Sequence, residues 1–342
     1  MKLIETTTIS DIDAAKWDSV TGDVLSMTHR WLHVMETQWN AYQPQYYLLE
    51  DAQGPCVAIV ADVFASVKEL GITGWLRQRL SLAVRPPLSS FCGVMVRPNS
   101  CLEVVMPALE PVLTQLCKQQ KRLLITVSNV GTSDLAGWRQ AGFLAAPQAK
   151  VSSLAMPETY EQYLASLRAK DRNELRRARR RGEKFGLRFE AGPLADDGEQ
   201  IFALFCEVFA KYGTPQEAVP FTSQFLAGMQ KKLADDMFFV RGYAGDQLAG
   251  VSLCFRNGPS LWVPTIGLNY EIARPSYLYF LLIDETIRWA IDNGIEHFSF
   301  GKTNERVKQR HGFQLEERWL CYRARLGVLN RAFSWVLPLV QR

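Results

Sequence analysis

The chain has 342 residues, which exceeds the usual core of one domain and suits two domains of roughly 150–200 residues each. Hydrophobic residues make up 47%, charged residues make up 22% and the net charge is +4, which is typical of a globular protein and excludes a disordered chain or a membrane bundle. The seven cysteines form no C-x-x-C pair, and the four histidines show no metal-binding spacing that also recruits a nearby carboxylate, so we expect a cytoplasmic protein without disulfides or a metal site.

The first half predicts a helix, a hairpin, a second helix and a further strand, in that order. A helical stretch near Trp31–Trp39 precedes two β-rich runs, Gln45–Glu50 and Cys56–Phe64, which flank a short turn and therefore predict a hairpin. The amphipathic stretch Leu102–Gln120 predicts a helix, and Lys121–Val127 predicts the strand that follows it.

The second half predicts the same order of elements. Its expected elements are the helix Gln200–Lys211, a helix ending at Leu233, the strands Met237–Tyr243, Leu248–Arg256 and Leu261–Leu268, the helix Tyr277–Asn293 and the strand Ile295–Phe300. In each half a short polar helix follows, ending in Gly142-Phe143 or Gly312-Phe313, before a last strand at Lys150–Met156 or Arg318–Leu326. This repetition indicates duplication; a single irregular α/β domain is the alternative.

Duplication predicts an α/β (α+β) protein with two tandem domains, 1–150 and 151–342. In each domain we expect a mixed, mostly antiparallel sheet flanked by helices. The stretch Ser66–Arg97 has no counterpart of similar length in the second half, so we interpret it as an insertion.

The positive charge is concentrated in one predicted basic helix, 160–185. Residues 168–188 include ten basic and three acidic side chains, a local balance of +7. Arg172, Arg176 and Arg179 recur at i, i+4 and i+7, which places them near one another on the helix. We predict that they bind an anion. The candidates are a phosphorylated donor, a nucleotide-linked acceptor, RNA and anionic lipid. The alternative is a solvated face that aids solubility.

Three local motifs lie in the second half. They are Tyr160-Glu161-Gln162-Tyr163-Leu164-Ala165-Ser166-Leu167 followed by Arg172-Asn173-Glu174-Leu175-Arg176-Arg177-Ala178-Arg179-Arg180, then Pro275-Ser276-Tyr277-Leu278-Tyr279-Phe280-Leu281-Leu282, and Phe298-Ser299-Phe300-Gly301 with Lys308 before Gly312-Phe313. With the order of elements, these motifs resemble the Fem-type peptidoglycan aminoacyltransferases and their relatives among the Gcn5-related N-acyltransferases. The resemblance implies tandem acyltransferase domains, the first of them diverged. Ser299 stands where related sequences often carry an acidic residue, so no carboxylate role is expected there.

The expected donor site departs from that of acyl-CoA enzymes in this superfamily. Those enzymes carry a turn of the form Arg/Gln-x-x-Gly-x-Gly/Ala before a helix, and its N–H groups hold a pyrophosphate. Here the segment reads Arg274-Pro275-Ser276-Tyr277-Leu278-Tyr279, with tyrosines in both small-residue positions. We expect no standard CoA clasp and no tightly bound cofactor, and the donor stays open between an acyl-CoA, an aminoacyl-tRNA and a carrier-protein thioester. Arg274, Ser276 and Tyr277 are candidate substrate-binding residues, with an N-cap as the alternative for Ser276.

The resemblance also implies catalytic residues. Lys308 matches a lysine that contacts the reacting groups in Fem-type enzymes, so we expect it to stabilise the oxyanion or to contact a phosphate; a solvated helix lysine is the alternative. Tyr270 and Glu271 are candidate catalytic residues, with Glu271 as the base for the amine or merely a turn cap. Tyr212 is a candidate acceptor contact. For His311 we expect a surface position on the helix.

The predicted function is transfer of an acyl or aminoacyl group to an amine of a cell-envelope or secondary-metabolite precursor, with tRNA as a further candidate partner. The alternative is a non-catalytic protein that retains the fold and holds an anionic glycan, lipid or protein partner. Two segments predict peripheral contact with the inner face of the membrane: the apolar tail Leu326–Val340 and the stretch with Trp75, Arg77 and Arg79. Core packing is the alternative for the tail.

Overall fold

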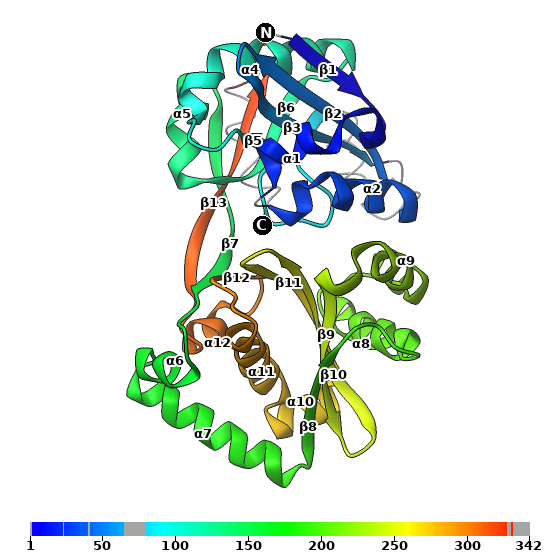
Figure 1. Ribbon diagram of the computed structural model, residues 1–342, viewed down its shortest axis with the longest axis vertical. Helices are drawn as coiled ribbons and strands as arrows, with labels where there is room; N and C mark the ends of the chain where they lie inside the picture. Colours follow the sequence, from blue (N-terminus) through cyan, green and yellow to red (C-terminus); the bar gives the residue numbers. More distant parts are fainter. Residues whose placement is uncertain (1, 23, 40–41, 65–79, 327–329, 331–342) are drawn as a thin grey trace. The chain divides into compact units, whose positions relative to one another are not determined.

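A computed structural model describes the chain at residues 2–22, 24–39, 42–64, 80–326 and 330 (Figure 1). It consists of two compact units. The first unit runs to Lys150 and also includes the chain from Glu317, and the second unit is Val151–Glu316. The predicted fold class, with two tandem units of mixed sheet and helices, is confirmed.

The first unit is a mixed sheet with helices packed against it. Its strands are β1 (Lys2–Thr6), β2 (Tyr42–Asp51), β3 (Gly54–Phe64), β4 (Ser81–Val84), β5 (Val94–Val96) and β6 (Leu124–Gly131). Two longer strands belong to it in part: β7, which runs from Leu144 to Ala155, contributes its beginning, and β13, which runs from Gln314 to Ala324, contributes most of its length. Its α-helices are α1 (Ala14–Thr21), α2 (His29–Gln38), α4 (Leu102–Gln119) and α5 (Leu135–Gln140). The strand order includes β1-β2-β3-β4-β6-β13, with β5 on β3, and β4 and β6 are parallel.

The second unit repeats this plan. Its strands are the end of β7, β8 (Leu187–Gly192), β9 (Met237–Ala244), β10 (Gln247–Asn257), β11 (Ser260–Leu268) and β12 (His297–Phe300). Its α-helices are α6 (Tyr160–Ser166), α7 (Ala169–Lys184), α8 (Gly198–Ala210), α9 (Ser223–Leu233), α10 (Tyr270–Ser276), α11 (Leu278–Asp292) and α12 (Glu305–Arg310). The strand order is β7-β12-β11-β10-β9-β8, and β11 and β12 are parallel.

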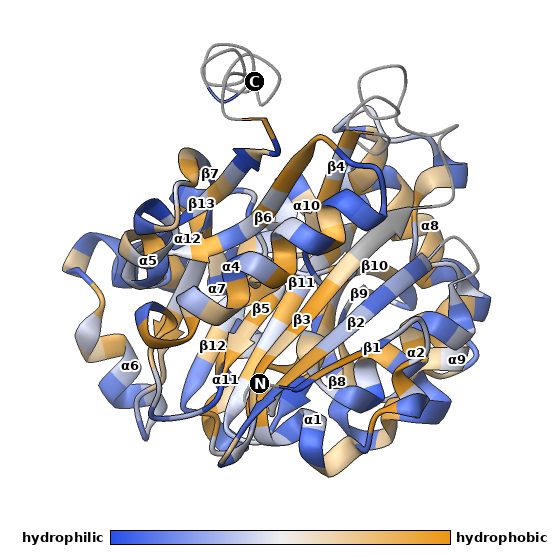
Figure 2. Ribbon diagram, turned by 90° about the horizontal axis from the view of Figure 1, so that it is seen from above, coloured by the Kyte–Doolittle hydropathy of each residue, from blue (hydrophilic) through white to orange (hydrophobic). Residues whose placement is uncertain are grey.

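Helices α8 and α11 cover opposite faces of the second unit's sheet. A side chain at Gly250 would collide with Leu282 of α11, whereas one at Gly267 would collide with Leu204 of α8. Gly250 lies opposite Leu268 in the ladder, and successive residues of a strand face opposite sides, so the two glycines point to different faces. Figure 2 shows hydrophobic residues concentrated in the strands, whereas the helices carry both hydrophobic and hydrophilic residues.

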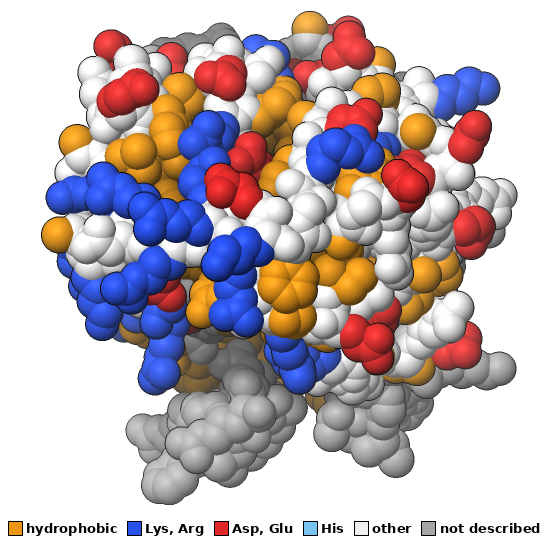
Figure 3. Space-filling model, turned by 90° about the horizontal axis from the view of Figure 1, so that it is seen from below, with side chains coloured by type: hydrophobic (Ala, Val, Ile, Leu, Met, Phe, Trp, Pro, Cys, Tyr) orange, Lys and Arg blue, Asp and Glu red, His pale blue; other side chains and the backbone are white. Residues whose placement is uncertain are grey.

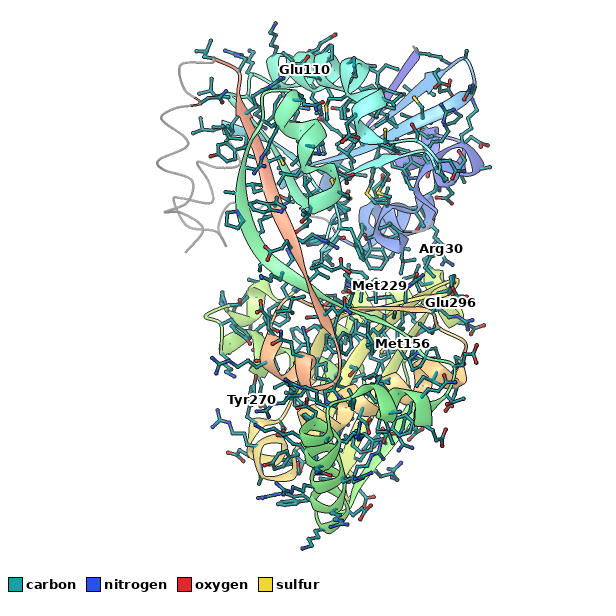
Figure 4. The ribbon with its side chains drawn as sticks, turned by 90° about the vertical axis from the view of Figure 1, so that its left-hand side faces the viewer. Arg30, Glu110, Met156, Met229, Tyr270 and Glu296 are labelled. Atoms are coloured by element: carbon teal, nitrogen blue, oxygen red, sulfur yellow. The ribbon has the colours of Figure 1, made fainter. Side chains whose placement is uncertain are left out.

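Each unit includes one strand from the other half of the chain. In the first unit, β13 pairs with β6 through Cys321 and Val127, and Arg323 donates to Glu110 of α4 at 2.5 Å. In the second unit, the end of β7 pairs with β12, and Met156 N donates to the Glu296 carbonyl at 2.9 Å (Figure 4). The predicted boundary, which assigned residues 151–342 to one domain, therefore differs from the structure after Glu316.

The prediction that Ser66–Arg97 is an insertion without a counterpart is wrong for strand β4, which lies within it. Strand β4 pairs in parallel with β6 in the same way that β11 pairs with β12, so β4 is the fourth strand of the repeated unit. The basic helix predicted over 160–185 is two helices, α6 and α7, with a break at Leu167 and Arg168. Strands β1 and β8 were not predicted.

Candidate functional site

Lys308 is buried, although it lies on a short polar helix. Its side chain is 1% exposed, and Nζ donates a hydrogen bond to the carbonyl of Gly301 and lies 4.6 Å from the centroid of the Phe300 ring. Burial lowers the pKa of Lys308 from 10.5 to about 7, and nearby Glu305 opposes that shift only in part. Lys308 forms no ion pair with any of the residues that the structure describes. The alternative of a solvated helix lysine is therefore wrong.

The lysine lies where two parallel strands separate. Strands β11 and β12 pair as far as Val263 and Phe300, and Gly301 N then donates to the Val263 carbonyl at 2.9 Å. Strand β12 ends there, while β11 continues to Leu268. A Cβ at Gly301 would lie 2.5 Å from the carbonyl oxygen of Pro264, so the strands can separate here only around a glycine. The Lys308 amine is thus held at the point of separation.

A buried hydroxyl lies close to this point on β7. Ser152 is fully buried, and its Oγ has no hydrogen-bond partner among the described residues. It stands directly opposite Phe300 in the β7–β12 ladder, so both side chains point to the same face of the sheet. An unpaired buried hydroxyl is available to a ligand or a water molecule. The sequence offered no signal for it beyond a polar residue in a predicted strand.

Three tyrosines gather at the start of α10 and α11. Burial raises the pKa of Tyr279, with a hydrogen bond from Asn304 opposing and Tyr212 and Tyr270 reinforcing the shift. Burial also raises the pKa of Tyr270 (labelled in Figure 4), next to Tyr212. Asn304 has left-handed backbone angles, and its carbonyl accepts a hydrogen bond from Lys308 N at 3.3 Å. Asn304, a residue that sequence reasoning missed, thus lies beside Tyr279 and at the start of the helix that carries Lys308.

Charged side chains surround Tyr270. Lys211 Nζ and the Arg274 guanidinium lie 5.0 and 5.5 Å from its ring centroid, and Glu207 accepts a hydrogen bond from Tyr270 N at 3.3 Å. Glu271 is exposed in the first turn of α10, where Asn269, and not Glu271, caps the helix. Lys211 and Glu207 were not predicted as site residues. Their only sequence signal is that both lie on the predicted helix Gln200–Lys211, which ends just before Tyr212.

The α10–α11 corner is closed by large side chains. Ser276 is fully buried, and its hydroxyl donates to the Ile272 carbonyl at 2.6 Å, so it neither caps α11 nor faces a substrate as predicted. Tyr277 joins the two helices at φ 61° and is 40% exposed. The guanidinium of Arg181 lies 5.5 Å from the Tyr277 ring and donates to the Pro275 carbonyl. Arg181 thus lies beside Tyr277, one of the two tyrosines at positions where a CoA clasp would carry small residues.

The predicted stripe of Arg172, Arg176 and Arg179 is not a free anion-binding surface. Arg172 donates to the carbonyls at the end of α6, including Ala165 at 3.2 Å. Arg179 pairs with the fully buried Asp284 and donates to the Tyr160 hydroxyl at 3.2 Å. Only Arg176 is exposed, with Asn173 Oδ1 at 3.2 Å. The prediction is wrong for Arg172 and Arg179 because neighbouring helices recruit their guanidinium groups.

His311 is fully buried, so its predicted surface position is wrong. The Tyr163 hydroxyl lies 3.2 Å from Nδ1, and the Phe280 ring lies 4.0 Å away between centroids. Burial lowers the pKa of His311 to about 3, so the imidazole is neutral at physiological pH. Its role is to join α12 to α6, which fixes the helix that carries Lys308.

Within the described ranges, no group of three or more His, Cys, Asp or Glu residues is suited to a metal ion. None of the described helices combines the length and apolarity needed to cross a membrane. The predicted membrane contacts at Trp75, Arg77 and Arg79 and in the tail after Leu326 lie outside the described residues, apart from Leu326 itself and residue 330.

Residues 169–309 match the family model of the acetyltransferase (GNAT) domain. Among solved structures, one is the C-terminal domain of a protein described as a lysylphosphatidylglycerol synthetase from Agrobacterium fabrum. It has 11% identity to this chain and a TM-score of 0.59, with 96% of each chain covered. FemX has 11% identity and a TM-score of 0.59, with 99% of this chain and 100% of FemX covered. A tandem GNAT protein from the clavulanic acid biosynthesis pathway has 12% identity and a TM-score of 0.57, covering 95% of this chain and 98% of that chain.

No curated protein matches the chain in sequence. The structural matches at this low identity concern the fold alone, and they agree with the two-unit architecture described above. The chain is therefore similar in sequence to the GNAT domain over residues 169–309, and over nearly its whole length it is similar in fold to FemX and to the tandem GNAT protein.

Proposed function

We propose that the second unit transfers an acyl or aminoacyl group from an activated donor to an amine, and that Lys308 acts on the reacting carbonyl. The observation that carries this proposal is a lysine 1% exposed, with its pKa lowered to about 7, at the separation of β11 and β12. An unpaired buried amine destabilises a fold. Perturbed groups of this kind concentrate at functional sites, which supports a catalytic role.

In this reaction the amine nitrogen attacks the donor carbonyl, a C–N bond forms, and the bond to the leaving group breaks. Lys308 Nζ donates to a backbone carbonyl, that of Gly301, and as an ammonium group it has further N–H bonds for the developing oxyanion. Tyr279 is protonated at neutral pH, as any tyrosine is, so its hydroxyl can donate a proton to the leaving group, and it then recovers one from solvent. The amine loses its proton to solvent.

The acceptor in this proposal is an amine on a cell-envelope or secondary-metabolite precursor. The names of the FemX, lysylphosphatidylglycerol synthetase and clavulanic acid pathway structures support that range of chemistry. For the donor, Tyr277 and Arg181 cover the corner where a pyrophosphate would approach the backbone. This arrangement favours an aminoacyl-tRNA or a carrier-protein thioester over a standard acyl-CoA.

The donor class is tested by thermal stabilisation at fixed low salt, with acetyl-CoA, longer acyl-CoAs, and charged and uncharged tRNA as ligands. We expect a shift with charged tRNA or with an acylated carrier protein, and the shift should shrink in Arg274→Ala, which removes an exposed guanidinium beside Tyr270. An equal shift with CoA alone, unchanged in Arg274→Ala, would contradict this donor preference. Lys231→Ala on α9 is the control, since Lys231 is also exposed.

A non-catalytic anion-binding protein is the second candidate. The observation that favours it is the exposed basic side of α7, which no described acidic residue fully neutralises. Such a protein would not depend on the buried amine, so loss of turnover in Lys308→Met with unchanged ligand binding would contradict it.

A further inference from the structure

Helix α7 presents a basic face on the side opposite its core contacts. The buried residues of the helix are Asp171, Leu175, Ala178 and Gly182. Lys170, Arg177 and Lys184 recur every seven residues, Arg180 lies between the last two, and all four are exposed. We call these four residues the basic face. Figure 3 shows Lys and Arg side chains gathered broadly on this side of the molecule.

The charge of the basic face is not neutralised from within the protein. Among the described residues, none of the four makes a hydrogen bond or an ion pair. Of the three acidic residues of the same helix, Asp171 pairs with Arg168 and Glu174 pairs with Arg310, each at 2.6 Å, and only the exposed Glu183 is left to offset part of the positive charge. Arg176 and Arg181, on the two flanks of the basic face, add further positive charge. The surface is therefore complementary to an extended anionic partner.

Large hydrophobic side chains are exposed at the end of this face. Phe185 is 43% exposed at the C-terminus of α7, and Tyr277 is 40% exposed beside Arg181. The Phe185 N–H donates to the Arg181 carbonyl at 3.1 Å, and Gly186 follows at φ 63°, so the backbone alone ends the helix. Because the aromatic ring of Phe185 is not needed to end the helix, its exposure calls for another explanation.

We propose that the basic face, with Phe185 and Tyr277 at its end, is a docking surface for a bilayer that contains anionic lipid. Basic side chains that adjoin exposed aromatic residues are typical of surfaces that bind the headgroup region, where charges meet phosphates and rings enter the interface. RNA is less suited to this surface, because the aromatic residues lie at its end and do not alternate with the arginines as a base-stacking platform requires. This inference does not depend on the acyl-transfer proposal.

Sedimentation with vesicles of phosphatidylcholine, alone or with a large fraction of phosphatidylglycerol, tests the proposal on the full chain. We expect binding only to the anionic vesicles, with affinity falling as salt rises. Each basic residue near such a surface contributes about fivefold in affinity, so Arg177→Glu with Arg180→Glu should weaken binding on the order of 25-fold or more. Phe185→Ser should weaken the salt-resistant part of the binding.

Matched variants separate docking from general charge and folding effects. Lys231→Glu with Lys232→Glu makes the same change in charge on exposed residues of α9, and Val104→Ser removes an exposed apolar side chain from the first unit. Both controls should bind vesicles like the unchanged protein, and all variants should unfold at the same temperature. Equal weakening by the α9 pair, binding to neutral vesicles, or binding of tRNA but not vesicles through Arg177 and Arg180 would each overturn the proposal.

Discussion

Lys308 and Trp138 occupy corresponding positions in the two units, each five residues before the phenylalanine of a Gly-Phe pair. The Lys308 carbonyl accepts a hydrogen bond from Phe313 N at 3.2 Å, and the Trp138 carbonyl accepts one from Phe143 N at 3.0 Å. Both side chains are 1% exposed. The same buried position thus holds an amine in the second unit and an indole in the first, and we infer that only the second unit has the lysine needed for the proposed chemistry.

Trp138→Ala should destabilise the first unit without changing the proposed chemistry. The Trp138 ring packs 4.8 Å from the Phe143 ring between centroids, and truncating a buried aromatic residue costs about 3–5 kcal/mol. We expect a lower free energy of unfolding in urea, with kcat of the remaining folded protein unchanged. A large fall in kcat at temperatures where the variant is fully folded would instead place the first unit in the reaction.

Lys308→Met should stabilise the fold, and the gain should depend on pH. The folded pKa of about 7 lies below the ordinary lysine pKa of 10.5, so the penalty for burying the ammonium is fully present below about pH 7 and disappears as pH rises towards 10.5. Methionine has a similar shape and no charge. The free energy of unfolding of the variant should therefore exceed that of the parent by a few kcal/mol near neutral pH. Urea unfolding of both proteins across this pH range measures the difference, and a constant or negative difference would contradict the assigned pKa.

The rate of transfer should fall as Lys308 loses its proton. If the ammonium group stabilises the oxyanion, kcat/KM decreases above about pH 7, on the alkaline side of its profile. Lys308→Arg keeps the positive charge at every accessible pH, so any activity it retains should lack this decrease. A pH profile of kcat/KM for both proteins provides the test. An alkaline limb that persists unchanged in Lys308→Arg would assign the titration to another group.

Ser152→Ala should weaken substrate binding without lowering stability. The Ser152 hydroxyl has no partner among the described residues, so its removal leaves no donor or acceptor unpaired. We expect a melting temperature that is unchanged or higher and a kcat/KM lowered by roughly tenfold, the effect of losing about one hydrogen bond to substrate. Ser153→Ala is the matched control, because the next residue of the strand faces the other side of the sheet. Equal kinetics in both variants would show that Ser152 does not touch substrate.

Local periodicity was sufficient to predict most elements of both units, because amphipathic helices and short β-rich runs carry their own sequence signals. The helix Leu102–Gln120 was predicted within one residue of α4, and Leu248–Arg256 within one residue of β10 at each end. Strand β4 was missed because it is short and lies within Ser66–Arg97, which was interpreted as an insertion. The sequence also carried no local signal that β7 pairs with β12 of the second unit and β13 with β6 of the first unit. Tertiary contacts determine which strand each of them pairs with.

The candidate site was predicted unevenly for a related reason. Helical spacing showed that Arg172 and Arg179 are neighbours, but spacing does not reveal which helices pack beside them, and those helices supply the carbonyls and Asp284 that engage both residues. Lys308 was found through the motif around Gly312-Phe313. Its burial depends on the Gly301 carbonyl and the Phe300 ring, which only the fold brings together.

The most direct test of the central claim is single-turnover transfer to an amine acceptor by the unchanged protein and by Lys308→Met, with acyl-CoA, aminoacyl-tRNA and acylated carrier protein supplied as donors. Loss of one oxyanion contact lowers the rate by roughly 10²–10³-fold. We predict product with at least one donor class, and a loss of that size in a variant that remains folded. Transfer by Lys308→Met at the unchanged rate would show that the buried lysine is not part of the reaction.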